Sequence, residues 1–313
     1  MRLVSFASSA IPQVRVGLVQ GQEVVDVDLA ARALNILPYE QMLDLIEHQG
    51  ESALTLQAIL EKARGRLFSE VRAFANIGAV HDLSSVHLAA PIPRPRKNIL
   101  CLGRNYYEHA LESYQARGEQ RPQGDAPVIF TKATTTINEP YGQIVIDPAL
   151  STQIDWEAEL AVIIGKTGKN ISEEQALSYV FGYTVLNDVT ARDIQDRFKQ
   201  FFKGKSIDGY CPIGPWIVTA DELPDPQALG LRLRVNGVIK QEGHTRDMIY
   251  QVKTIISLLS QGMTLEPGDI IATGTPSGVG FARKPPEFLK AGDVVETEID
   301  GIGLLRNAVV NAD

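Results

Sequence analysis

The stretch IDWEAELAVIIGK, residues 154–166, decides how the rest of the sequence is interpreted. It is rich in Ile, Val, Leu and Trp, which is typical of a strand that enters a core. It nevertheless carries two carboxylates, Glu157 and Glu159, two positions apart. Because side chains alternate along a strand, both carboxylates are expected on one face, with Trp156 and Leu160 on the other. Burying two neighbouring like charges is unfavourable unless something compensates for their repulsion.

Two explanations fit this acidic pair. The simpler one is an edge strand whose glutamates face water, where Glu is usually found. The other is a divalent cation, since Mg2+ and Mn2+ take oxygen ligands and would turn the repulsion into attraction. Asp188 is the best third carboxylate, because it follows the apolar strand pattern VFGYTVLN and directly precedes a helix-start signal, Thr190 with Asp193. Asp188 could equally serve only to start that helix, which is expected over residues 190–202.

A histidine and a glutamate share a helix face in GRNYYEHALE, residues 103–112. His109 and Glu112 are three positions apart, so they are neighbours on a helix surface. A carboxylate bound to an imidazole fixes its tautomer and raises its basicity, so the pair could activate water. An ordinary surface pair would have the same spacing.

Two further motifs could bind an anion. The GKS at residues 204–206 is not a phosphate loop, because Lys199 stands where that motif needs its first glycine. Lys205 is then either a surface lysine or a cation for a substrate carboxylate or enolate. TGTPSGVG, residues 273–280, follows a strand and could bring backbone N–H groups and the Thr275 hydroxyl to an anionic ligand, or form only a tight turn.

Composition narrows the class of protein. The chain has 313 residues, 44% of them hydrophobic, and its net charge of -8 argues against a nucleic-acid partner. Its two cysteines, Cys101 and Cys211, provide neither a disulfide framework nor metal-ligand spacing. No secretory signal is visible, and no apolar run approaches the roughly 18 to 20 residues of a membrane span. We therefore expect a cytoplasmic protein without a membrane partner.

The pattern of strands and helices predicts two domains. Residues 1–90 are expected to form a small α+β domain, with a helical pattern over 39–63 that is interrupted at Gly50. Residues 91–97 form a proline-rich linker, and residues 98–313 form a β-rich catalytic domain. Asn236-Gly237 between alternating strands is a hairpin signal. Strands and helices do not alternate regularly, so a doubly wound parallel sheet is disfavoured.

Several long motifs together resemble the fumarylacetoacetate hydrolase family, in family order and over about residues 96–313. They are GRNYYEHALE, DWEAELAVIIG, GYTVLNDVTARDIQ, FKGKSIDGYCPIGPW, VNGVIKQEG, DMIY and GDIIATGTPSGVG. The N-terminal region and PPEFL, residues 285–289, resemble bacterial members that include oxaloacetate decarboxylases. The resemblance implies an α+β, mainly β fold of rolled antiparallel sheets, a homodimer, and one Mg2+ or Mn2+ per subunit.

The resemblance also implies roles for individual residues. The implied metal ligands are Glu157, Glu159 and Asp188, and the implied catalytic residues are His109, Glu112 and Lys205. The implied substrate-binding residues are Tyr106, Arg192, Gln195 and Thr275. One position departs from the animal fumarylacetoacetase, which has an acidic metal ligand where Asn105 stands. This departure argues against fumarylacetoacetate itself as the substrate.

The expected reaction is metal-dependent cleavage of a C–C bond in a 2-oxo acid that has a carbonyl at carbon 4. His109 would activate water to attack that carbonyl, and the pyruvate enolate would leave, stabilised by the metal and Lys205. Oxaloacetate decarboxylation would use the same enolate site and is the alternative. Hydratase or isomerase chemistry, or an inactive protein that binds small acids, ranks lower. Residues 105–125 are expected to form a lid that closes over the substrate.

Overall fold

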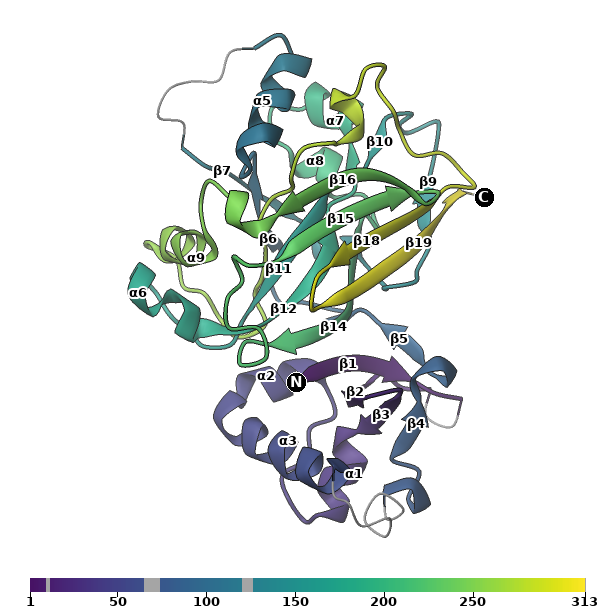
Figure 1. The fold of residues 1–313 in the computed structure, drawn as a ribbon, viewed down its shortest axis with the longest axis vertical. Helices are drawn as coiled ribbons and strands as arrows, with labels where there is room; N and C mark the ends of the chain where they lie inside the picture. Colours follow the sequence, from purple (N-terminus) through teal and green to yellow (C-terminus); the bar gives the residue numbers. More distant parts are fainter. Residues whose placement is uncertain (10–11, 65–73, 120–125, 313) are drawn as a thin grey trace.

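The computed structural model describes residues 1–9, 12–64, 74–119 and 126–312. The N-terminal part lies at the bottom of Figure 1 and the larger C-terminal part above it. The N-terminal elements are β1 (Arg2–Ala7), β2 (Arg15–Gln20), β3 (Glu23–Asp26), α1 (Val27–Ala33), α2 (Met42–Glu47), α3 (Gln49–Arg64), β4 (Val80–Asp82) and β5 (His87–Ala89). No helix in the described ranges is long and apolar enough to cross a membrane.

One large sheet runs through both parts of the molecule. Its other strands are β6 (Ile99–Gly103), β7 (Val128–Lys132), β8 (Ile137–Asn138), β11 (Ala158–Ile164), β12 (Val180–Asn187), β14 (Cys211–Thr219) and β17 (Ile270–Ala272). Among the described residues the strand order is β4-β3-β2-β1-β14-β12-β11-β17-β6-β7, with β5 paired to β1 and β8 to β14. Most neighbours are antiparallel, and β1 joins the two parts by pairing with β14.

A second sheet carries the predicted hairpin. It has the order β16-β15-β18-β19-β9, with bounds β9 (Ile144–Ile146), β15 (Gly230–Val235), β16 (Val238–His244), β18 (Val294–Ile299) and β19 (Gly303–Asn311). A short pair, β10 (Ile154–Asp155) with β13 (Thr190–Ala191), shares a buried hydrophobic cluster with this sheet. Asn236 and Gly237 both have positive φ at the β15–β16 turn, as the sequence predicts. The fold is α+β and mainly β, with mostly antiparallel sheets, which confirms the expected class.

Short helices flank the sheets at the upper end of Figure 1 and on its left. They are α5 (Tyr107–Ala116), α6 (Glu173–Ala176), α7 (Arg192–Arg197), α8 (Phe202–Lys205) and α9 (Val252–Ser260). The single-turn 3-10 helices are η1 (Leu83–Ser85), η2 (Thr134–Thr136), η3 (Leu177–Tyr179), η4 (Thr245–Asp247) and η5 (Gly280–Ala282). Residues 120–125 of the expected lid lie outside the described residues, whereas α5 carries its first part.

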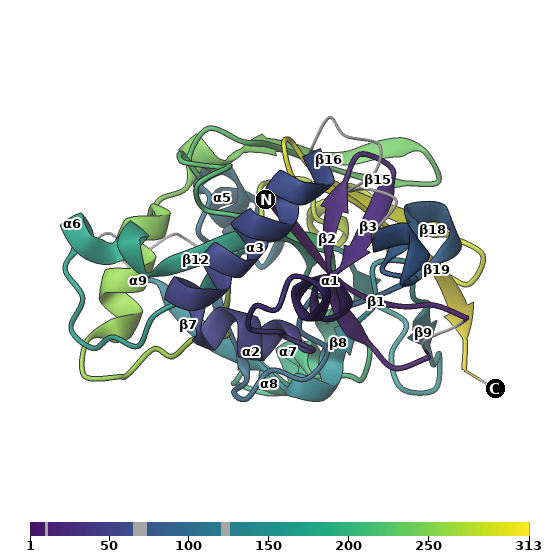
Figure 2. The same cartoon turned by 90° about the horizontal axis from the view of Figure 1, so that it is seen from below.

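The N-terminal helices share a hydrophobic core with the large sheet. Figure 2 shows α1, α2 and α3 in front of the strands when the molecule is seen from below. Ile46 of α2 and Ile59 of α3 belong to the same buried cluster as Ile163, Phe181 and Ile217 of β11, β12 and β14. The boundary between an N-terminal domain and the rest therefore stays a prediction, because strand pairing and core packing both cross it.

Local structure corrects several expectations. The expected break of the first long helix at Gly50 lies instead at His48, between α2 and α3. The helix expected over 190–202 is two short helices, and α7 begins at Arg192 without a side-chain cap, so the Thr190 capping box is wrong. Strand β11 lies between β12 and β17, which rules out the edge-strand explanation of the acidic pair.

Candidate functional site

Three carboxylates gather where β11 begins and β12 ends. Glu157 directly precedes β11, Glu159 lies within it, and Asp188 directly follows β12. The antiparallel register pairs Ala158 with Asn187, so the start of one strand meets the end of the other. The backbone N–H of Asp188 donates to the carbonyl of Glu157 at 2.9 Å, which fixes this junction. All three side chains are buried, and one ligand oxygen from each lies within 4.8 Å of the others.

Buried lysines alternate with these carboxylates. The Nζ of Lys205, at the end of α8, donates to Glu157 Oε2 at 2.7 Å and to Asp188 Oδ2 at 2.6 Å. The Nζ of Lys132, at the end of β7, donates to the other oxygen of Asp188, Oδ1, at 2.7 Å. Lys132 also donates to the backbone carbonyl of Lys205. One buried lysine therefore holds both a carboxylate of the cluster and the backbone of the second lysine.

An arginine and an aspartate continue the alternation on the other side of Glu157. Arg192, the first residue of α7, donates to Glu157 Oε1 at 2.6 Å and to Asp155 Oδ2 at 2.8 Å. Asp155 also accepts the backbone N–H groups of Gly280 at 2.6 Å and Phe281 at 3.1 Å. The result is a chain of buried cations and anions in strict alternation, which offsets the cost of burying each charge.

Glu159 stands outside this alternating chain. Its side chain accepts a hydrogen bond from the backbone N–H of Gly274 at 2.7 Å. Burial, together with the nearby carboxylates of Asp188 and Glu157, raises the pKa of Glu159 well above its ordinary value. Burial also acts to raise the pKa of Glu157, but Lys205 and other cations outweigh it and lower that pKa to about 2. The two glutamates of one short motif therefore have opposite electrostatic surroundings.

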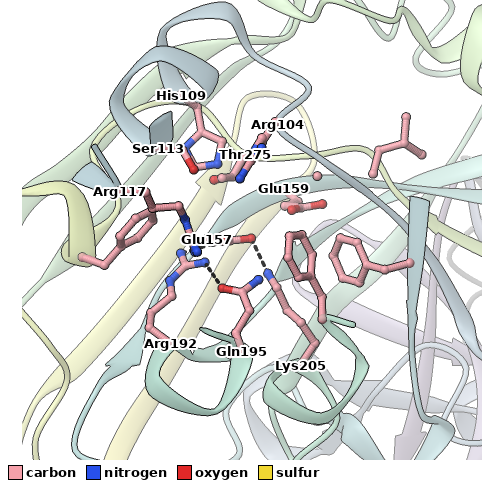
Figure 3. Close-up of a pocket in the computed structure, with 15 residues that line it drawn as sticks. Arg104, His109, Ser113, Arg117, Glu157, Glu159, Arg192, Gln195, Lys205 and Thr275 are labelled. Atoms are coloured by element: carbon pink, nitrogen blue, oxygen red, sulfur yellow. Dashed lines mark hydrogen bonds and ion pairs between the residues drawn. The ribbon is translucent and has the colours of Figure 1, made fainter. Parts of the chain in front are cut away.

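The predicted dyad forms on α5. His109 Nδ1 lies 2.9 Å from Glu112 Oε1, and the histidine side chain is buried. The carboxylate of Glu112 also accepts the backbone N–H of Gly278, at 3.1 and 3.0 Å to its two oxygens. Because Glu112 occupies Nδ1, the second ring nitrogen of His109 is the one left to meet a ligand. In Figure 3, His109 lies on the opposite side of the carboxylates from Lys205 and Gln195.

A cavity of about 380 Å³, including its open mouth, lies between the dyad and the carboxylates. The predicted site residues that line it are His109, Glu157, Glu159, Arg192, Gln195, Lys205 and Thr275. Glu112 lies behind His109, and Asp188 lies behind Lys205, each joined to its neighbour by the hydrogen bonds above. Tyr106 is not part of this lining; its side chain is buried, and its hydroxyl has no hydrogen-bond partner among the described residues.

The glycine-rich loop over residues 273–280 organises the protein's own carboxylates. Its N–H groups at Gly274, Gly278 and Gly280 are the donors to Glu159, Glu112 and Asp155 described above. The sequence predicted N–H donors in this loop for an anionic ligand, but these three are used inside the protein. The Thr275 hydroxyl does line the cavity, and it accepts a hydrogen bond from Gln241 at 2.8 Å, so its own hydrogen remains to be donated.

Sequence reasoning missed three buried polar residues that support the site. Lys132 and Asp155 end the alternating chain of charges. Gln241 of β16 joins the first residue of β11 to the glycine-rich loop, because it accepts the N–H of Ala158 at 2.9 Å and donates to Thr275. The sequence did contain a signal for Lys132, because a lysine in the apolar strand VIFTK is buried only if it is paired with an anionic group. Asp155 adjoins the acidic pair and offered a similar signal.

The chain has many similar proteins. Residues 98–310 match the family model described as fumarylacetoacetate (FAA) hydrolase C-terminal. An oxaloacetate tautomerase, YisK of Bacillus subtilis, is 49% identical over 74% of this chain and 75% of its own length. The mitochondrial oxaloacetate tautomerase fahd2 of Xenopus laevis is 43% identical over 99% of this chain and 90% of its own length.

Solved structures agree with this assignment. A fumarylacetoacetate hydrolase from Exiguobacterium antarcticum is 37% identical, with a TM-score of 0.79, over 100% of both chains. A maleylpyruvate hydrolase from Sphingobium, solved with manganese(II) and pyruvate, is 30% identical, with a TM-score of 0.76, over 100% of both chains. Family model, relatives and solved structures all lead to one assignment: this chain belongs to the fumarylacetoacetate hydrolase family.

Proposed function

We propose that this protein interconverts the keto and enol forms of oxaloacetate. The observation that carries the proposal is a histidine–glutamate dyad that faces buried carboxylates and Lys205 across one small cavity. Tautomerisation moves one proton from carbon 3 to the oxygen on carbon 2, so it needs one base and a cationic environment for the enolate. The curated relatives named above support oxaloacetate as the substrate, since they are oxaloacetate tautomerases.

We propose Glu157, Glu159 and Asp188 as ligands of one Mg2+ or Mn2+. The residues present fit such an ion, because they offer three hard oxygen donors and because Glu159 is a buried carboxylate whose neighbours leave excess negative charge. When bound, the ion would act as a Lewis acid towards the 2-oxo group. The Sphingobium hydrolase solved with manganese(II) supports this choice of ion.

The chain's own residues have separate roles in the proposed reaction. His109, oriented through Nδ1 by Glu112, takes the proton from carbon 3 at its other ring nitrogen and later returns a proton to the enolate. Lys205 supplies a buried positive charge for the enolate oxygen; although burial acts to lower its pKa, Asp188 and Glu157 raise it, so the amine stays charged. The amide of Gln195 and the hydroxyl of Thr275 line the cavity as hydrogen-bond donors for the carboxylate groups of the substrate.

Hydrolysis of an acylpyruvate is the second candidate function. The maleylpyruvate hydrolase among the similar structures supports it, and the same dyad could activate a water molecule. The sequence alone ranked this reaction first and oxaloacetate decarboxylation second. We place tautomerisation ahead of both because the tautomerases are 49% and 43% identical to this chain, against 30% for that hydrolase. All three reactions form an enolate at the same place, so they are distinguished by their products.

Three assays on the Mn2+-loaded protein separate these reactions. Loss of the enol absorbance of oxaloacetate reports tautomerisation, pyruvate formation from oxaloacetate reports decarboxylation, and loss of acetylpyruvate absorbance reports hydrolysis. We expect tautomerisation to be the fastest, and the His109→Gln variant to lose it while it still binds Mn2+. Tautomerisation no faster than in buffer, with rapid hydrolysis of acetylpyruvate, would refute the proposal. The expected homodimer and cytoplasmic location remain predictions, which gel filtration and cell fractionation would test.

A further inference from the structure

Arg104 differs from the other cations that line the cavity. Arg192 and Lys205 are each paired with carboxylates of the buried chain, and Arg117 is paired with Asp196. No carboxylate among the described residues pairs with Arg104. Its guanidinium lies over the ring of Tyr114 on α5, with the guanidinium carbon 4.2 Å from the ring centroid. Stacking on a ring leaves the N–H groups at the edge of a guanidinium available to an anion.

The backbone at Arg104 is held in a conformation that an arginine rarely adopts. Its φ is +56°, in the left-handed region that favours glycine. The next residue, Asn105, clamps this turn: its amide donates to the carbonyls of Thr273 at 2.7 Å and Tyr250 at 3.0 Å, and it accepts the N–H of Tyr250 at 2.8 Å. The N–H of Ile249 also donates to the carbonyl of Asn105 at 2.7 Å. Strained residues that their surroundings hold so firmly cluster at functional sites.

Arg104 faces the part of the cavity where the far end of a substrate would lie. Arg104 lines the same cavity as Thr275 and His109, and Figure 3 shows it across the carboxylates from Lys205. In the proposed function, the 2-oxo carboxylate end lies at the carboxylate cluster, and His109 acts on the next carbon. The group beyond that carbon therefore extends towards Arg104. A planar guanidinium is well suited to bind a carboxylate through two parallel hydrogen bonds.

We infer that Arg104 binds the distal carboxylate of the substrate and makes the site selective for dicarboxylic 2-oxo acids. This inference rests on the proposed function and adds a residue that sets substrate choice. The strained turn and its Asn105 clamp are explained by the same role, because they hold the guanidinium at the cavity wall against Tyr114. A 2-oxo acid with a neutral tail gains nothing from Arg104.

The test compares a substrate that has a distal carboxylate with an inhibitor that lacks a tail. In the Mn2+-loaded Arg104→Met protein, we expect kcat/KM for oxaloacetate to fall about 10- to 100-fold, mainly through KM, as loss of a charged hydrogen-bond partner predicts. The inhibition constant of oxalate, which fills only the chelating end, should change less than about twofold, and Arg104→Lys should recover part of the loss. Arg2→Met is a matched control, because Arg2 also lies over an aromatic ring, that of Trp216, and does not line the cavity.

Three results would overturn the inference. The first is an unchanged kcat/KM for oxaloacetate in Arg104→Met. The second is a rise in the oxalate inhibition constant as large as the loss in kcat/KM, which would place the effect at the carboxylate cluster. The third is a selective loss in Arg117→Met but not in Arg104→Met. Arg104→Gly, which suits a positive φ, separates function from folding: it should show the same kinetic loss without a lower melting temperature. A wild-type protein that is inactive on oxaloacetate would refute the proposed function and this inference together.

Discussion

The two glutamates of the motif should affect the metal-free protein in opposite directions when each is replaced by glutamine. Glu157 is paired with Lys205 and Arg192, so Glu157→Gln removes one of the two carboxylate partners of each of these buried cations. Glu159 is a carboxylate that burial and the nearby Asp188 hold at a raised pKa, so Glu159→Gln removes a charge that the fold disfavours. The glutamine oxygen can still accept the N–H that Glu159 accepts. Both variants should lose Mn2+ affinity, because each removes one of three proposed ligands.

The magnitudes follow from linkage between protonation and folding. At pH values between the ordinary pKa of 4.5 and the raised pKa of the folded state, Glu159 binds more protons in the folded protein than in the unfolded chain. Its contribution therefore lowers the free energy of unfolding by about 1.4 kcal/mol per pH unit as the pH rises. At pH 7 this contribution opposes folding, and Glu159→Gln would remove it. The contribution of Glu157 to the free energy of unfolding has the opposite sign, because the pKa of Glu157 in the folded protein is about 2. This stabilising contribution is fully present above pH 4.5 and is lost as the pH falls towards 2. Breaking its buried pairs at pH 7 costs about 3 to 5 kcal/mol.

Urea unfolding of the EDTA-treated protein at several pH values between 4 and 8 measures both effects. We expect Glu159→Gln to be more stable than wild type at pH 7 and Glu157→Gln to be less stable, with both differences shrinking as the pH approaches 4. Mn2+ should stabilise the wild type far more than either variant. The reasoning is wrong if both glutamine variants change the stability of the metal-free protein in the same direction at pH 7. It is also wrong if Glu159→Gln alone is less stable than wild type there.

Three further substitutions test other parts of the site. His109→Gln should lower kcat about 100-fold or more, while leaving the Mn2+ affinity measured by titration unchanged, because the histidine transfers protons without holding the ion. Lys132→Met removes a buried cation from Asp188 and should lower the free energy of unfolding by about 3 to 5 kcal/mol in urea titrations and weaken Mn2+ binding. A Cβ at Gly204 would lie 2.6 Å from a backbone nitrogen of α7, so Gly204→Ala should displace α8 and lower both kcat and the melting temperature. Gly50→Ala is its control: nothing lies within 4 Å of that Cβ, and the helix should gain about 0.5 to 1 kcal/mol.

Patterns that depend on burial and turn chemistry were readable from the sequence. The apolar run after Glu159 predicted a core strand, and β11 is buried throughout. Asn236-Gly237 predicted a hairpin, since positive φ is needed at both positions. The family motifs singled out ten site residues, and seven of them line one cavity. The alternation argument placed Glu157 and Glu159 correctly on one side, but Trp156 and Leu160 pack into two different hydrophobic clusters.

The boundaries of short helices were not readable, because contacts between distant segments set them. The strand pattern EVVDVDL continues past Asp26, yet β3 ends there, because the Asp26 side chain accepts the N–H of Leu29 and starts α1. The helix expected from Thr190 starts only at Arg192, since Thr190 pairs with Asp155 in a short sheet. Lys132 likewise has a partner, Asp188, that lies 56 positions away in the sequence.

Charge balance in the buried site connects the proposed substrate to the residues around it. The alternating chain from Lys132 to Asp155 pairs each cation with an anion, which leaves the carboxylate of Glu159 as the excess charge outside the dyad. A divalent cation would reverse the sign of that excess, and a dicarboxylate would reverse it again. The guanidinium of Arg104 then brings the cavity close to neutrality, which a buried site requires. Proton transfer from carbon 3 to His109 moves one positive charge from the substrate to the dyad. The summed charge of the cavity and the dyad stays the same, so tautomerisation can proceed without a counterion entering or leaving the cavity.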